Sequence, residues 1–217
     1  VTTDQISSPQ PIPALGIIPP GQQLILPKPA EAAPYPGVLL PDSAVINSPC
    51  GKDLDVAAAI QQAGGVLNTY TQTVNNETLT GAQVVQLVAN NTSVNPRFLL
   101  AFIEFRSHWF TQNPAEPNLS YPLSLNTPNY NGLYLELSLA AKMLNTGYYA
   151  WREGRMTELT FAGGGSVTIA PELNAGTVGL QYLFSQLFSQ GNFVTALYGE
   201  NGFMVTYKTL FGDPGEC

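Results

Sequence analysis

Hydrophobic positions recur with helical spacing along most of the chain beyond residue 50. The clearest stretch is residues 95–109, NPRFLLAFIEFRSHW, in which apolar side chains surround most of the circumference of a helix. Asn95 is a suitable N-cap, and Pro96 takes the first helical position, where its missing amide costs nothing. Because a helix that is apolar nearly all round is buried, we expect this segment to be the central helix of the core.

Further helices are predicted on both sides of this segment. The first of them begins near Asp53 and Asp55 and ends at Gly64-Gly65. Thr80 is the N-cap of another. Leu137, Ala140, Ala141 and Leu144 form one apolar face of a later helix. The predicted helices cover residues 53–63, 66–74, 80–89, 133–152, 174–189 and 192–211, the last with a break at Gly199 or Gly202.

One strand pair is also predicted. Residues 157–161 and 166–169 are rich in β-branched and apolar side chains, and they flank the turn Ala-Gly-Gly-Gly at residues 162–165. Residues 111–131 are rich in Pro and Asn and are expected to form a loop. The pattern therefore predicts a mainly α fold with one small β-hairpin.

Residues 1–49 differ from the rest of the chain. They hold eleven of the eighteen prolines and only four charged residues. Proline lacks the amide donor that helices and central strands need, so we expect an extended arm of residues 1–49 followed by a helical domain of residues 50–217. This arm could dock on its own domain or on another copy of the chain, and the second alternative would make the protein self-assemble through residues 1–49.

Composition and charge restrict the partners of the chain. Only 11% of its residues are charged and 44% are hydrophobic, a balance that excludes a disordered protein. The net charge is −7, and the eight Lys and Arg residues are scattered, which opposes binding to nucleic acid or to an anionic membrane surface. No apolar run is long enough to span a bilayer, and a start at Val1 fits removal of an export signal.

The two cysteines, Cys50 and Cys217, stand at the two ends of the expected helical domain. A disulfide between them would close a long loop, which in the chain-entropy model stabilises the fold by roughly 4–5 kcal/mol. Cys217 could instead bond to a neighbouring molecule. His108 is the only histidine, so the chain lacks the set of ligands that a zinc site requires, and no metal or cofactor is expected.

Two of the predicted helices carry motifs of a known enzyme class. Residues 94–109, VNPRFLLAFIEFRSHW, resemble the central helix of lytic transglycosylases and related lysozyme-like enzymes, in which a run such as NP-x-LL-ALI-x-x-ES-G places the catalytic Glu directly before a Ser. Residues 173–183, LNAGTVGLQYL, look like the N-x-x-x-G-x-x-YL helix of the same enzymes. The resemblance implies a lysozyme-like helical domain and peptidoglycan as its substrate or ligand.

A longer stretch resembles a second group of proteins. Four short motifs match the helical region before the zinc-peptidase domain of secreted lysostaphin-like proteins of Chloroflexi: LPDS at 40–43, GAQVVQ at 81–86, NAG at 174–176 and LFGDP at 210–214. Residues 21–27, GQQLILP, are similar to the closing strand of LysM carbohydrate-binding modules but too short to be one. The resemblance implies a secreted protein of the bacterial cell envelope, and the missing zinc ligands exclude transfer of the peptidase activity.

The lysozyme-like motif departs from its pattern at the catalytic position. Arg106, not Glu, precedes Ser107, and a guanidinium cannot donate the proton that glycoside hydrolysis requires. Glu104 lies roughly 200° around the helix from that position, on the side expected to be less buried and near His108 at i+4. Glu136 is the second candidate acid, and it is also a candidate partner for a buried Arg106.

Aromatic residues provide the remaining candidate site. Tyr121, Tyr130, Tyr134 and Trp151 could form a cleft that stacks on sugar rings, although aromatics at helical spacing more often belong to a core. The sequence as a whole predicts a secreted, catalytically degenerate lysozyme-like domain that acts as a structural, self-assembling or cell-wall-binding module. The alternative is a peptidoglycan glycosidase of lysozyme or lytic transglycosylase type that uses an atypical carboxylate.

Overall fold

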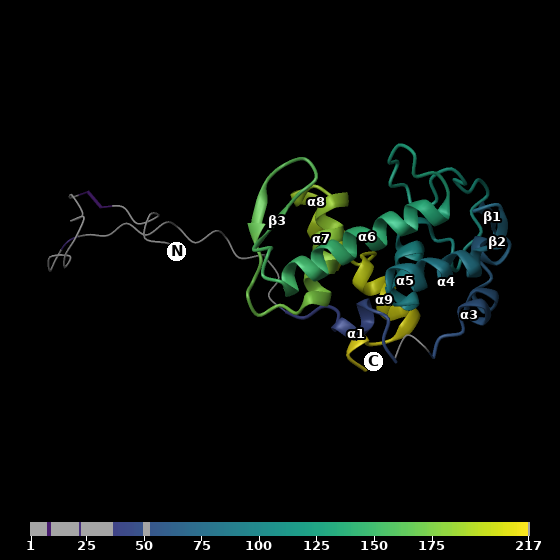
Figure 1. Ribbon diagram of the computed structural model, residues 1–217, viewed down its shortest axis with the longest axis horizontal. Coiled ribbons are helices and arrows are strands. Elements are labelled where there is room, and N and C mark those ends of the chain that lie inside the picture. The colour runs from purple at the N-terminus through teal and green to yellow at the C-terminus, as the bar shows by residue number, and fades with distance from the viewer. Residues whose placement is uncertain (1–7, 10–21, 23–36, 50–52, 217) are drawn as a thin grey trace.

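The computed structural model describes residues 8–9, 22, 37–49 and 53–216 of the chain. Its fold is mainly α with small antiparallel hairpins, so the predicted fold class is confirmed. The longest helix, α6 (Leu133–Arg152), runs the length of the domain, with α7 and α8 towards one end and α3, α4 and the β1–β2 hairpin towards the other (Figure 1). The other bounds are α1 (Asp42–Val45), α3 (Val56–Ala63), β1 (Thr71–Val74), β2 (Glu77–Thr80), α4 (Gly81–Thr92), α5 (Pro96–Ser107), β3 (Glu158–Thr160), β4 (Ser166–Thr168), α7 (Ala175–Leu187), α8 (Gln190–Tyr198) and α9 (Phe203–Phe211), with short 3-10 turns at Val66–Asn68 and Pro214–Glu216.

Helix α5 is the buried central helix that its sequence predicts. Every residue from Phe98 to Glu104 is buried. The Asn95 side chain accepts a hydrogen bond from the amide of Arg97 at 3.0 Å, and Pro96 occupies the first turn. His108, with φ 59°, ends the helix in the left-handed conformation. The helix packs against α4 and α9, which places its last turn beside the C-terminal helices.

Local capping explains why two other predicted helices are confirmed. Thr80 and Gln83 form a reciprocal capping box at the start of α4, in which each side chain accepts a hydrogen bond from the other residue's amide. Asp55 caps α3, and Gly64, with φ 71°, ends it. The C-terminal prediction is confirmed as well, because α8 and α9 are separate helices with the break at 199–202.

The predicted helix over residues 66–74 is wrong. After a 3-10 turn at Val66–Asn68, the chain forms strand β1, which pairs with β2 in an antiparallel hairpin. Asn75 and Asn76 form the two-residue turn with φ values of 51° and 68°. Asparagine tolerates this left-handed conformation, and a turn of this kind matches the twist of paired strands. Gln72 on β1 then accepts a hydrogen bond from the amide of Tyr134 at 3.0 Å, which fixes the start of α6.

The predicted β3–β4 hairpin is confirmed around its glycine turn. Gly163, Gly164 and Gly165 all have φ between 86° and 97°, values that other residues rarely adopt.

A further glycine permits the close approach of helices α6 and α7. A Cβ atom on Gly147 of α6 would lie 2.4 Å from Cβ of Tyr182 on α7, so only glycine allows these two helices to approach as they do.

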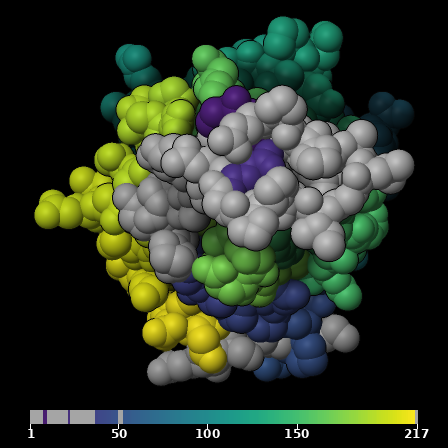
Figure 2. All heavy atoms as spheres, turned by 90° about the vertical axis from the view of Figure 1, so that its left-hand side faces the viewer, coloured from purple at the N-terminus to yellow at the C-terminus, as the bar shows by residue number. Residues whose placement is uncertain are grey.

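The segment of residues 37–49, assigned by the sequence prediction to the arm, belongs to the core. Leu40 and Val45 are completely buried. The carboxylate of Asp42 accepts hydrogen bonds from the Asn174 side chain and the Gly176 amide, both at 2.8 Å, and so holds the segment against the start of α7. Figure 2 shows blue spheres of the early chain directly beneath green spheres of the later chain on this face of the domain. The folded unit therefore begins before Cys50, while most of the predicted arm, Cys50 and Cys217 lie outside the described residues.

The structure offers no membrane-spanning element in its described part. No helix among these residues combines the length and the apolar character that a bilayer crossing requires. This agrees with the sequence-based expectation of no membrane span.

Candidate functional site

Arg106, at the position where the lysozyme-like motif has its acid, fastens a loop. Its Nε donates a hydrogen bond to the carbonyl of Leu123 at 2.8 Å, and its Nη2 donates to the carbonyl of Ser124 at 3.1 Å. The guanidinium also lies over the ring of Phe188, 5.5 Å from its centroid. Burial lowers the pKa of Arg106, and the charge of Glu136 opposes this shift. Arg106 therefore positions the chain that follows α5.

Glu136 fastens the same loop from the first turn of α6. Its side chain is completely buried, and its two oxygens accept hydrogen bonds from the backbone amides of Leu123, Leu125 and Asn126 at 2.6, 2.8 and 3.2 Å. Burial raises the pKa of Glu136, while these three amides and Arg106 act to lower it. In the described structure Glu136 and Arg106 do not form a direct ion pair; each bonds to the loop between them. We call Arg106, Glu136 and residues 123–126 the loop clamp.

Glu104 is buried, which corrects the expectation that it lies on the less buried side of the helix. One of its oxygens accepts hydrogen bonds from the amides of Phe110 and Thr111, at 3.1 and 3.0 Å, and the other accepts from the hydroxyl of Thr111 at 2.6 Å. The expected neighbour at i+4 is present, since Nδ1 of His108 lies 3.6 Å from Oε1. The carboxylate thus closes the turn after α5.

The four candidate aromatics do not share one cleft. Tyr134 and Trp151 stand near opposite ends of α6, seventeen positions and therefore about 25 Å apart. The indole of Trp151 donates a hydrogen bond to the carbonyl of Leu173 at 2.8 Å, at the end of the domain away from the loop. Tyr121 and Tyr130 are half-buried in the loop between α5 and α6. A glycan site built jointly from all four residues is not supported by this arrangement.

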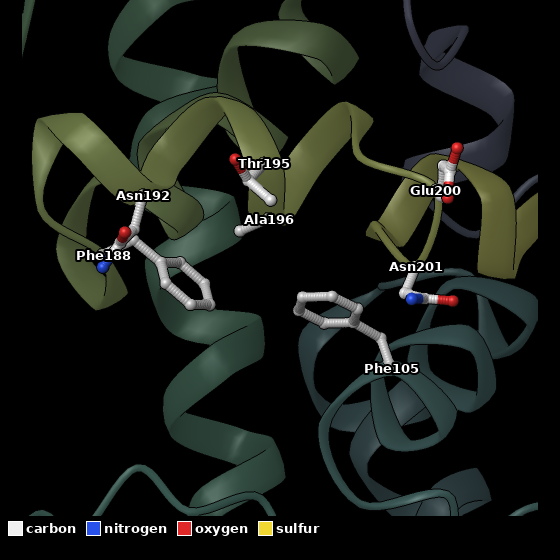
Figure 3. Close-up of a pocket in the computed structure, with 7 residues that line it drawn as sticks. All are labelled: Phe105, Phe188, Asn192, Thr195, Ala196, Glu200 and Asn201. Carbon is white, nitrogen blue, oxygen red and sulfur yellow. The ribbon is translucent and has the colours of Figure 1, made fainter.

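A cleft of about 530 Å³ opens instead between the end of α5 and helix α8. Figure 3 shows the rings of Phe105 and Phe188 entering from opposite sides and pointing toward one another beneath Ala196. The centroids of these two rings are 6.3 Å apart. Asn192, Thr195, Glu200 and Asn201 complete the lining.

A second hollow of about 280 Å³ adjoins the first along α9. Phe105, Glu200 and Asn201 line both, so the two hollows are neighbours, and we call them together the α5–α9 groove. The second part adds side chains of α5, the turn after it, and α9: Glu104, His108, Thr111, Val205, Thr206, Thr209 and Leu210. No lining residue of either hollow is Lys or Arg. Sequence reasoning missed this groove because Phe105 and Phe188 have the spacing of core residues.

The described residues form a small helical domain with a groove along α5, α8 and α9, and no cluster of three or more potential metal ligands occurs among them. The family model described as "LasA, N-terminal domain" matches residues 38–216, and the chain belongs to this family. The match starts where the buried segment 37–49 begins, which agrees with the position of that segment in the core.

The family supports part of the resemblance found in the sequence. A LasA-like, peptidase-associated protein agrees with the expected region before a peptidase domain, and with a bacterial, secreted protein. The comparisons do not support the lysozyme-like relationship or the assignment to Chloroflexi. No curated protein and no solved structure matches the chain.

Proposed function

We propose that this chain is a non-catalytic module of a LasA-type secreted protein, and that it binds the bacterial cell wall without cutting it. The family match supports the secreted, cell-envelope part of this proposal. The binding role is our inference from the site, in which Glu104, Arg106 and Glu136 hold loops in place and the groove is lined mainly by aromatic and uncharged polar side chains, with Glu200 exposed among them.

The observation that carries the proposal is that both candidate acids already hold the backbone of neighbouring loops. A general acid must present a proton to the leaving oxygen of the substrate. The carboxylate of Glu104 already accepts three hydrogen bonds from the chain after α5, and that of Glu136 accepts three from the loop. Arg106 occupies the motif's catalytic position and cannot be deprotonated in proteins. The two acids that the sequence suggested, Glu104 and Glu136, are therefore both engaged in holding the chain, and Glu200 is the exposed carboxylate that lines the groove.

The glycosidase alternative has one observation in its favour, because Glu104 lines the smaller hollow of the groove. Its carboxylate could reach a bound sugar only by releasing Thr111. The glycosidase alternative predicts that the chain cuts cell walls, whereas the binding role predicts that it binds them without cutting. Assays of sedimentation and of turbidity therefore separate the two.

The test uses the complete chain and purified cell-wall sacculi. Sedimentation with the walls should carry the protein into the pellet, and the turbidity of the suspension should stay constant across the pH range in which the protein is folded. The Glu104→Gln variant is the matched control and should bind equally well. Clearing of the suspension by the wild type and not by Glu104→Gln would establish the glycosidase, and a failure to sediment would refute the binding role.

Self-assembly through residues 1–49 remains a prediction. Of that range the structure describes residues 8–9, 22 and 37–49, and the last of these segments packs in its own domain. Analytical ultracentrifugation of the chain, with and without residues 1–36, addresses it directly.

A further inference from the structure

The α5–α9 groove combines two kinds of lining that suit a particular ligand chemistry. Phe105, Phe188 and Ala196 give it an apolar floor and wall, with Val205 and Leu210 at the other end. Amide and hydroxyl side chains stand beside this floor. Asn192, Asn201, Thr195 and Thr209 are exposed, and Thr206 is half-buried. Sites of this composition take ligands that have both an apolar face and several neutral hydrogen-bonding groups.

The charges of the groove oppose an anionic ligand. Glu200 is exposed and lines both hollows, Glu104 lines one of them, and the two hollows have no cationic lining residue apart from His108 in its protonated form. The guanidinium of Arg106 lies over the ring of Phe188, but Arg106 does not line either hollow, and its Nε and Nη2 donate to the carbonyls of Leu123 and Ser124. Because like charges placed opposite each other across an interface are unfavourable, phosphate or carboxylate groups are disfavoured as the part of a ligand that enters the groove, and neutral units of the same polymer are favoured.

The backbone of the groove opposes an extended peptide. Its lining comes from helices α5, α8 and α9 and from the turns that connect them. Binding by strand addition requires an exposed strand edge with unpaired amides and carbonyls, and the described hairpins β1–β2 and β3–β4 contribute no lining residue. Recognition in this groove must therefore come from side chains.

We infer that the α5–α9 groove binds a neutral, N-acetylated polysaccharide, with the acetamido groups as the main determinant. An acetamido group carries a methyl, which can lie on the apolar floor that Phe105 and Phe188 form together, and an amide, which can both donate to and accept from Asn192 or Asn201. Sugar rings present apolar C–H faces to the two aromatic rings and hydroxyls to the threonines. This inference rests on the proposed function and assigns its ligand class and binding site.

The test is a calorimetric titration of the complete chain with soluble chitin oligosaccharides, which are uncharged and acetylated on every unit. The groove variants are Asn201→Ala and Asn192→Ala, both at exposed positions, and Phe188→Leu, which keeps most of the packing volume. Tyr149→Ala is the matched control, because this exposed tyrosine lines a separate hollow with Lys142 and Asn91. Circular dichroism melting confirms that each variant is folded.

The expected result is binding that weakens roughly tenfold in each groove variant, as for a central contact residue, and that is unchanged in Tyr149→Ala. Cello-oligosaccharides, which lack the acetamido group, should bind at least tenfold more weakly than chitin oligosaccharides. Equal affinity for both sugars would overturn the assignment of the ligand class. Folded groove variants that bind the oligosaccharides like the wild type would overturn the assignment of the site.

The same variants distinguish this inference from the function on which it rests. If wild type and groove variants sediment with cell walls equally well, the groove is not the site, while wall binding stands. If the wild type does not sediment at all, the proposed function fails, and the titration alone decides whether the groove binds N-acetylated sugars.

Discussion

Three consecutive residues at the end of α5 belong to two different regions, the contacts that hold the neighbouring loops and the α5–α9 groove. Glu104 and Arg106 turn inward, toward the chain after the helix and toward the loop clamp, and their polar atoms are occupied by backbone groups. Phe105, between them, lines the α5–α9 groove. The charged side chains thus hold loops in place, and the apolar one lies at the open surface. In this protein the charged residues of the motif hold loops in place, and the site that we propose is the groove beside them, whose lining is mostly uncharged.

The largest expected effect comes from breaking the loop clamp. Glu136→Ala leaves the amides of Leu123, Leu125 and Asn126 without their acceptor and leaves Arg106 without its nearby negative charge. We expect the free energy of unfolding to fall by about 3 kcal/mol or more, measured by urea denaturation. Glu116→Ala, at an exposed position in the preceding loop, should change it by less than about 0.5 kcal/mol. A loss below about 1 kcal/mol for Glu136→Ala would contradict the clamp.

Substituting each buried acid, Glu136 and Glu104, by its isosteric amide shows how differently the two carboxylates are held. In Glu136→Gln the new NH₂ group faces an N–H donor of the loop, so we expect a loss of about 1–3 kcal/mol. In Glu104→Gln the amide oxygen can keep the bonds from Phe110 and Thr111, and the NH₂ group can donate to the Thr111 hydroxyl, so the loss should stay below about 1 kcal/mol. Chemical denaturation of both variants under one condition measures the difference, and equal losses would show that the two carboxylates are not held as described.

The stability of the clamp should also depend on pH. Because burial raises the pKa of Glu136, the folded chain keeps its proton to a higher pH than the unfolded chain does. Stability therefore decreases as pH rises from the ordinary carboxyl range through the raised pKa. The advantage of the wild type over Glu136→Gln, which does not titrate there, should shrink across this window in a series of unfolding measurements. An advantage that grows with pH would mean that the amides and Arg106 outweigh burial.

The smallest expected effect on stability is at the groove. Asn201→Ala removes an exposed side chain, so the free energy of unfolding should change by less than about 0.5 kcal/mol, while affinity for N-acetylated oligosaccharides falls. Together with Glu136→Ala this gives the two halves of the comparison: one substitution that strongly destabilises the domain, and one that leaves its stability unchanged and weakens its binding. A groove variant as destabilising as the clamp variant would show that the groove is part of the core.

Sequence reasoning succeeded where the signal is local. The caps of α3, α4 and α5 and the glycine turn of β3–β4 depend on residues a few positions apart, so their elements could be predicted. The β1–β2 hairpin was missed because its apolar residues also fit a helix and its turn consists of two asparagines in place of glycine.

The site could not be predicted for a different physical reason. The groove brings Phe105 together with Phe188 and Asn201, more than eighty positions later, and the clamp joins Arg106 and Glu136 through a loop between them. Periodicity shows that these side chains are apolar or charged, but not which partner each one meets. Packing between distant segments decides this. In the folded chain the two candidate acids, Glu104 and Glu136, hold neighbouring loops in place.

The most direct test of the central claim is sedimentation and turbidity measured on the same suspension of purified cell walls. The account predicts that the wild-type chain enters the pellet, that Asn201→Ala enters it less, and that the walls keep their turbidity with both proteins. Solubilisation of wall sugars by the wild type, abolished in Glu104→Gln, would contradict it.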